Sequence, residues 1–169
     1  LDKRQFACGA AEIIKMAATS DVSLFEKIEA EGIGTENLES VIEAALRIKI
    51  DVVEKDEKEA GLRKVLNFGH TLGHGIESCT DFLHGEAVAL GILPMCSEAV
   101  RERLIDMFRK ADLPVSCNAG ADRVIAAAMH DKKAEGNSVS TVQVDEPGSF
   151  RFAKCTKEEL EKLYKEVFI

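Results

Sequence analysis

The sequence lacks the features that mark a membrane protein, a disulfide-rich secreted protein or a nucleic-acid-binding protein. No uninterrupted apolar run approaches the roughly eighteen residues that a membrane-spanning helix needs. The five cysteines are odd in number and form no CxxC pair, which argues against a disulfide framework or a structural cysteine zinc site and favours a reducing cytoplasm. A net charge of −8 argues against a nucleic-acid or acidic-membrane partner, which would need a basic face.

The chain also lacks an initial Met and the layout of a signal peptide. It opens directly into sequence typical of a folded domain, so we expect it to be part of a longer protein. A length of 169 residues with 46% hydrophobic and 31% charged residues is ordinary for one soluble globular domain. We find no repeat, linker or low-complexity segment, so residues 1–169 are expected to form a single domain.

Helical patterns fill most of the chain. Five stretches have helical spacing or composition: 9–20, 24–32, 35–59, 62–78 and 84–104. Asp21 or Ser23 would cap the second stretch and Gly32 would end it. The third is amphipathic, with apolar residues at helical spacing: Leu38, Ile42, Ala45, Leu46 and Val53. The fifth is apolar nearly all round in its first half, which predicts a buried helix.

Strand patterns occur only late in the sequence. Residues 138–144 and 149–155 alternate around the sequence DEPGS, which resembles a hairpin loop. A last helix follows a capping box made by Thr156 and Glu159. The sequence therefore predicts a mainly α domain with a small β hairpin near the C-terminus.

Three of the four histidines lie close together, and each is beside a glycine: His70, His74 and His84. His70 and His74 are four apart on one predicted helix, so they share a face, and neutral imidazoles at this spacing can chelate a divalent metal. This is not the HExxH motif, because Thr71 follows His70. The alternative for such a pair is packed core or surface histidines. The position of His84 just before a predicted buried helix favours a functional site over packed or surface histidines.

Glycines surround the histidines at positions 69, 73, 75 and 85. Glycine costs about 1 kcal/mol in a helix interior relative to alanine. These glycines would let the backbone approach closely around the three rings, and tight packing between helices is the alternative explanation.

Glu12 is the best acidic candidate to complete a metal site. Catalytic zinc usually has three protein ligands, and two histidines with one carboxylate are a common set. Glu12 lies among Ala and Ile, where a surface Glu is less expected, and Lys15 follows one turn later. The alternative is an amphipathic helix that exposes both residues to water as a weak ion pair.

A polar stripe is predicted on the helix of the histidines. Arg63, Asn67, His70 and His74 are spaced by four, three and four residues and would share one helix face. Such a stripe can bind a metal at one end and an anion at the other, although most polar stripes are solvated surface. Lys49, on the preceding predicted helix, is a further basic group near this stretch.

Five segments, in this order, resemble the C-terminal domain of the 3-dehydroquinate synthase family, which belongs to the sugar-phosphate cyclases: FACGAAEIIK, RIKIDVVEKDE, GLRKVLNFGHTLGHGIE, LHGEAVALGI and DKK. The resemblance covers nearly the whole chain. In that family an N-terminal α/β domain holds most of the NAD site, and a mainly α-helical C-terminal domain holds the metal and much of the substrate pocket. The resemblance implies that this chain is the second part. The lack of a Gly-rich strand–turn–helix for a dinucleotide is consistent with this.

By position, the resemblance implies Zn²⁺, or Co²⁺, held by Glu12, His70 and His84. It assigns His74 to the substrate, although spacing alone paired it with His70. The substrate contacts that it implies are Lys15, Lys49, Arg63, Asn67, His74 and one lysine of the DKK sequence, which we take to be Lys133. His74, Lys15 and Arg63 would be the catalytic members of this set.

The implied reaction is the NAD- and zinc-dependent conversion of 3-deoxy-D-arabino-heptulosonate 7-phosphate to 3-dehydroquinate with release of phosphate, in the shikimate pathway. The resemblance also implies a homodimer. The alternatives are a cyclase for another sugar phosphate, a related metal-dependent alcohol dehydrogenase, and a metal-binding or helical interaction domain that is inactive on its own. Arg63 and the DKK lysines favour the first reaction, because its substrate has both a carboxylate and a phosphate.

Overall fold

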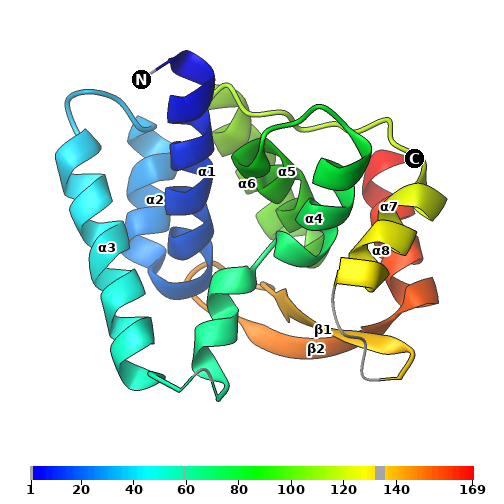
Figure 1. Cartoon of the computed structure of the whole chain (residues 1–169). Coiled ribbons are helices and arrows are strands. Elements are labelled where there is room, and N and C mark those ends of the chain that lie inside the picture. Colours follow the sequence, from blue (N-terminus) through cyan, green and yellow to red (C-terminus); the bar gives the residue numbers. More distant parts are fainter. Residues whose placement is uncertain (1, 59, 132–135) are drawn as a thin grey trace.

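The structure, a computed structural model, describes residues 2–58, 60–131 and 136–169 as a mainly helical bundle (Figure 1). The α-helices are α1 (Lys3–Ser20), α2 (Val22–Glu31), α3 (Leu38–Lys55), α4 (His70–Cys79), α5 (His84–Ile92), α6 (Glu98–Lys110), α7 (Ala121–Asp131) and α8 (Lys157–Phe168). Two short 3₁₀ helices, η1 (Leu62–Asn67) and η2 (Leu93–Met95), connect them. The strands are β1 (Ser138–Gln143) and β2 (Arg151–Thr156).

Helix α1 is the centre of one side of the bundle, where it packs against α2, α3 and α5. Its alanines allow this close packing, since Ala11, Ala17 and Ala18 are fully buried. Helices α4 and α5 pack together in the middle, with α7 against α4 and α8 against α7. The hairpin lies across one end of the bundle (Figure 1). In the described part of the chain, no helix is both long and apolar enough to cross a membrane.

Local sequence signals set several element boundaries as expected. The Asp21 side chain accepts a hydrogen bond from the backbone N–H of Leu24 and caps α2, which ends at Gly32. Thr156 and Glu159 form the predicted capping box of α8. The two strands pair antiparallel over their whole length. The mainly α fold with a small hairpin is confirmed.

The single helix predicted over residues 62–78 is wrong. Residues Leu62–Asn67 form η1, and α4 begins at His70 after a left-handed Gly69 with φ of +79°. A Cβ atom at Gly69 would lie 2.5 Å from Cγ1 of Ile92 and 2.8 Å from the carbonyl oxygen of Val88. The contact with α5 therefore requires a glycine here, and its backbone turns the chain out of the helical path.

The stretch 84–104 is also not one helix. Its first part is α5, which is buried as predicted, with Val88, Leu90 and Ile92 fully inaccessible. Pro94 lies in η2, and Ser97 starts α6 by accepting a hydrogen bond from the N–H of Val100. The proline and the cap divide the stretch into two helices.

Helix α3 is confirmed as a helix, but most of its predicted apolar face is not in the core. Of the five apolar residues named above for this stretch, only Ala45 is buried. Ile42 and Leu46 are 40% and 51% exposed, and Ile50 is 54% exposed. These three residues are four apart and form one exposed apolar row, which we call the α3 stripe.

Candidate metal centre

Glu12, His70 and His84 come from three different helices and meet at one point. Glu12 lies in the middle of α1, His70 is the first residue of α4, and His84 is the first residue of α5. One ligand atom from each lies within 4.8 Å of the other two. The ring centroid of His70 is 5.2 Å from that of His84, and His74 is 5.4 Å and 5.8 Å from the two.

Two contacts between α1 and α5 place His84 near Glu12. A Cβ atom at Gly85 would lie 2.6 Å from the Cα of Cys8, so only a glycine lets α5 begin this close to α1. Arg4 of α1 donates to both carboxylate oxygens of the buried Glu86, at 2.6 Å and 2.7 Å. This bidentate pair lowers the pKa of Glu86 and fixes the start of α5. Sequence analysis did not identify it.

The two carboxylate oxygens of Glu12 have different surroundings. Oε2 accepts a hydrogen bond from Nζ of Lys15 at 2.6 Å, and the same Nζ donates to the carbonyl oxygen of Leu66 at 2.8 Å. Lys15 is only 5% exposed, so the pair is not the solvated surface pair considered above. Oε1 is buried and has no hydrogen-bond partner in residues 2–58, 60–131 and 136–169. A buried carboxylate oxygen without a partner is costly, and a cation beside it would remove that cost.

His70 is suited to bind a cation as a neutral ring. Burial, and next the positive charge of Lys15, lower the pKa of His70 from its ordinary value to about 4. Its Nδ1 lies 3.2 Å from the carbonyl oxygen of Phe68. Because a carbonyl only accepts, Nδ1 holds the proton in this contact, and Nε2 keeps its lone pair.

His84 has a partner that sequence analysis did not identify. Its Nδ1 lies 3.0 Å from Oε2 of Glu77, which is on α4. Glu77 also belongs to a second group of possible ligands, with His74 and His84, whose atoms lie within 4.8 Å of one another. The available sequence signal was its position three residues after His74, on the same face of α4.

The donor set fits a divalent cation. Two imidazoles and one carboxylate suit zinc and cobalt among other divalent metals. The neutral His70 and the unpaired Oε1 of Glu12 are the two local features that such an ion would satisfy.

The predicted polar stripe does not form. Residues of a 3₁₀ helix are about 120° apart around its axis, so Arg63 and Asn67, four apart on η1, do not share a face. Gly69 then separates both from His70 and His74 on α4. Only His70 and His74 remain four residues apart on one helix, α4, as predicted.

The other predicted substrate contacts within the described residues lie on three different elements, α1, α3 and η1. Lys15 is joined directly to Glu12. Lys49 is exposed on α3, and Arg63 is half-buried on η1. Lys133 lies outside the described residues.

The segment before η1 is fixed by Asp56, another residue that the sequence analysis missed. Its carboxylate accepts hydrogen bonds from the backbone N–H groups of Ala60, Gly61 and Arg63, at 2.7, 2.8 and 2.9 Å. These hydrogen bonds lower the pKa of Asp56. They hold the backbone of Arg63, and with it the start of η1.

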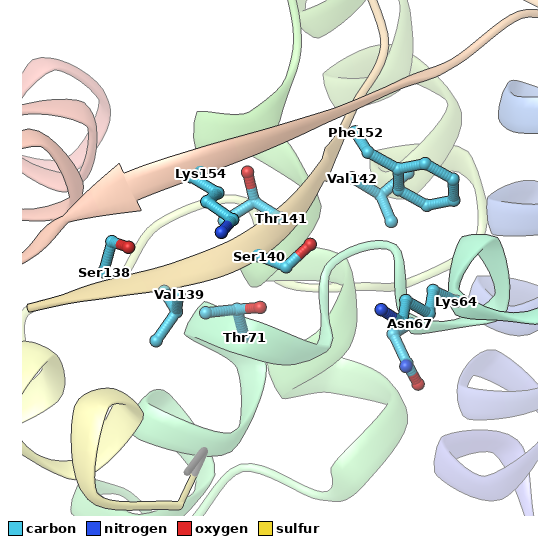
Figure 2. Close-up of a pocket in the computed structure, with 10 residues that line it drawn as sticks. All are labelled: Lys64, Asn67, Thr71, Ser138, Val139, Ser140, Thr141, Val142, Phe152 and Lys154. Atoms are coloured by element: carbon cyan, nitrogen blue, oxygen red, sulfur yellow. The ribbon is translucent and has the colours of Figure 1, made fainter. Parts of the chain in front are cut away.

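A pocket of about 360 Å³ lies between the hairpin and the segment η1–α4 (Figure 2). Lys64, Asn67 and Thr71 form one wall, and the hairpin forms the other, with Ser140 and Lys154 among its polar residues. Glu12, His70 and His84 are not among the described residues that line it. Asn67 therefore lines the hairpin pocket together with Lys64, three residues earlier on η1.

The fold matches those of two solved synthases. The chain matches the structure of a 2-epi-5-epi-valiolone synthase from Streptomyces hygroscopicus, solved with NAD⁺ and Zn²⁺, with a TM-score of 0.84 at 24% identity over 99% of this chain and 52% of that one. It matches a 2-deoxy-scyllo-inosose synthase, solved with carbaglucose-6-phosphate, NAD⁺ and Co²⁺, with a TM-score of 0.81 at 20% identity over 98% of this chain and 52% of that one. At these identities the similarity shows the fold alone.

Sequence comparison gives the family. The family model described as 3-dehydroquinate synthase C-terminal matches residues 9–134, and the chain belongs to this family. The 3-dehydroquinate synthase of Campylobacter concisus is 40% identical over 94% of this chain and 50% of that protein. That of Synechocystis is 34% identical over 96% of this chain and 51% of that protein. The chain spans about half the length of the curated relatives it matches.

Proposed function

We propose that this chain is the metal- and substrate-binding part of a 3-dehydroquinate synthase, a carbon–oxygen lyase. The reaction converts 3-deoxy-D-arabino-heptulosonate 7-phosphate to 3-dehydroquinate and releases phosphate. Family membership and the 34–40% identity to 3-dehydroquinate synthases support this choice over other cyclases. The structural observation behind it is the buried, unpartnered Oε1 of Glu12, in the residue that meets His70 and His84.

In this proposal Glu12, His70 and His84 hold Zn²⁺, and Co²⁺ can replace it. When bound, the ion supplies Lewis-acid polarisation of a substrate oxygen. Bound NAD supplies the hydride chemistry, mostly from the N-terminal α/β domain, and the present chain supplies position and charge. The solved relatives that contain NAD⁺ with Zn²⁺ or Co²⁺ support this pair of cofactors.

Lys15 and His74 are the proposed catalytic groups nearest to the ion. Lys15 donates two hydrogen bonds, to Glu12 and to the Leu66 carbonyl, which leaves one of its three N–H groups without a partner in the described chain. That N–H can neutralise a substrate oxyanion beside the metal. The ring of His74 lies 5.4 Å from that of His70 and would exchange a proton with the substrate.

Substrate anions are the proposed ligands of the remaining polar residues. Arg63, a third catalytic group, and Lys49 would bind carboxylate and phosphate, together with Lys133. Asn67 would donate its amide to a substrate oxygen. Asn67 also lines the hairpin pocket in this structure.

The proposed protein partner is the N-terminal NAD-binding domain, in an enzyme that forms a homodimer in the cytoplasm. The chain spans half the length of its relatives, which supports a second domain. The uncovered α3 stripe is an apolar surface of the kind that such a domain covers. All five cysteines are free thiols, which suits a reducing compartment.

The first test is the metal content of the purified chain before and after the substitution His84→Ala. We expect about one zinc per chain, lost in the variant, because three ligands are the minimum for such a site. A wild-type chain that refuses added zinc would contradict the metal assignment.

The second test is a chimera in which this chain replaces the matching half of the Campylobacter concisus enzyme. With NAD and Zn²⁺ it should release phosphate from the heptulosonate phosphate, and the His70→Asn chimera should not. A folded chimera that binds zinc but acts only on another sugar phosphate would contradict the proposed substrate. It would still support a sugar-phosphate cyclase.

A further inference from the structure

We propose that Glu77 is a positioning residue of the metal centre. Its carboxylate accepts a hydrogen bond from Nδ1–H of His84 and so directs Nε2 of that ring to the ion. This inference rests on the proposed metal site and adds a residue to it.

The three proposed ligands each have one orienting contact. Lys15 holds Oε2 of Glu12, and the carbonyl oxygen of Phe68 holds Nδ1 of His70. For His84 the contact is Oε2 of Glu77, 3.0 Å from Nδ1. In each case the hydrogen bond occupies one nitrogen or oxygen atom of the side chain, and the other one remains able to bind the ion.

His84 needs such a contact more than the other two ligands do. Its side chain is 47% exposed, whereas that of Glu12 is 35% exposed and His70 is half-buried. An exposed ring at the first position of a helix is free to rotate, and its fixation then depends on a hydrogen bond. Glu77, on the facing helix α4, supplies that bond.

The contact also selects the tautomer of His84. A carboxylate only accepts hydrogen bonds, so the proton of the neutral ring lies on Nδ1 and the lone pair on Nε2. A carboxylate behind a histidine ligand raises the basicity of that ligand, and loss of such a partner typically weakens metal binding about 10–100-fold.

The competing explanation is that Glu77 is itself a ligand, in the group with His74 and His84. In that arrangement Glu12 would not bind the ion, and its buried Oε1 would remain without a partner. An ion held by Glu12, His70 and His84 would contact that oxygen. Glu77 would then keep its hydrogen bond with Nδ1 of His84. The geometry therefore favours the positioning role.

The test is the Zn²⁺ affinity of the purified chain, measured by competition with a chromophoric chelator. For Glu77→Ala we expect binding about 10–100-fold weaker, and for Glu77→Gln a smaller loss, since the amide oxygen still accepts a hydrogen bond from Nδ1–H. The matched control is Glu43→Ala, which removes an exposed ion pair with Arg47 on α3. It should bind zinc as the wild type does.

Two further measurements distinguish the possible outcomes. Unfolding of the metal-free chains shows whether Glu77→Ala and Glu43→Ala are equally folded. The visible spectrum of the Co²⁺-loaded chain should change in Glu77→Ala, because the His84 ring is no longer fixed.

Unchanged affinity and spectrum in Glu77→Ala, with binding lost in His84→Ala, would overturn the role of Glu77 and leave the metal site intact. Full binding in His84→Ala would instead overturn the metal site itself. Tight binding in Glu12→Gln together with none in Glu77→Ala would make Glu77 a ligand, which also contradicts the positioning role.

Discussion

Gly85 of α5 lies against Cys8 of α1 so closely that a Cβ atom on the glycine would be 2.6 Å from the Cα of Cys8. Because this contact joins the helix of His84 to the helix of Glu12, Gly85→Ala should move the two ligands apart. We expect weaker zinc binding, although no ligand is changed, and it can be measured by the same chelator competition.

The control for this prediction is Gly9→Ala on α1. A Cβ atom there meets nothing within 4 Å. Since alanine is the better helix former by up to about 1 kcal/mol, this variant should be equally or more stable and bind zinc normally. Normal zinc binding by Gly85→Ala would mean that α5 can shift without moving His84.

The low pKa of His70 predicts a pH dependence of the metal-free chain. Between about pH 6.5, where an unfolded histidine titrates, and pH 4, the unfolded chain binds a proton at His70 that the folded chain does not. Stability therefore rises with pH across this window and falls on acidification. At pH 5 the loss relative to neutral pH is at most about 2 kcal/mol.

Urea unfolding at pH 7 and pH 5, in wild type and in His70→Asn, isolates this effect. Other groups titrate in both proteins. The contribution of His70 is therefore the difference between the two proteins in how much unfolding free energy each loses from pH 7 to pH 5. Equal losses would contradict the buried, neutral state of the ring.

Asp56→Ala should loosen the segment before η1, because three backbone N–H groups lose their acceptor. We expect faster amide hydrogen exchange at Gly61 and Arg63, with zinc affinity unchanged. The low pKa of Asp56 also means that its stabilising effect is present above the unfolded value near 3.9 and is lost as pH falls through the folded value. Unchanged exchange in the variant would show that other contacts hold η1.

The α3 stripe should matter for assembly and not for the fold of this chain. Ile42→Glu with Leu46→Glu should leave the stability of the isolated chain within about 0.5 kcal/mol, since both residues are exposed. In the chimera, the same two substitutions should lower activity or solubility, because they would prevent this domain from packing against the N-terminal domain. The control is Ile169→Ser, which removes an apolar residue that is 80% exposed at the other end of the chain. Full activity of the double variant would leave the stripe without a role in domain contact.

Sequence alone predicted those elements whose boundaries depend on neighbouring residues. The Asp21 cap, the Thr156–Glu159 capping box and the alternating strands are all local patterns. The break at Gly69 was not predictable in this way, because the atoms that exclude a side chain there belong to Ile92 and Val88 on another helix. Periodicity likewise identified apolar residues on α3 but could not tell whether anything covers them.

The candidate site was only partly accessible to pattern analysis. Spacing paired His70 with His74, and sequence context made Glu12 the acidic candidate. The set of Glu12, His70 and His84, with His74 left to the substrate, came from family resemblance. In the structure, the donors that meet are far apart in sequence, and no periodic rule relates them. Glu77 was missed for the same reason: its position on α4 was visible, but its partner His84 begins a different helix.

The origin of the three proposed ligands on α1, α4 and α5 has a consequence for folding. An ion held by them would be a removable cross-link that closes the chain between residues 12 and 70 and again between 70 and 84. Since an unfolded chain has no such preformed site, free metal concentration would enter the folding equilibrium by mass action. The melting temperature of this domain would then follow the supply of zinc, and a chelator would act on it as a mild denaturant.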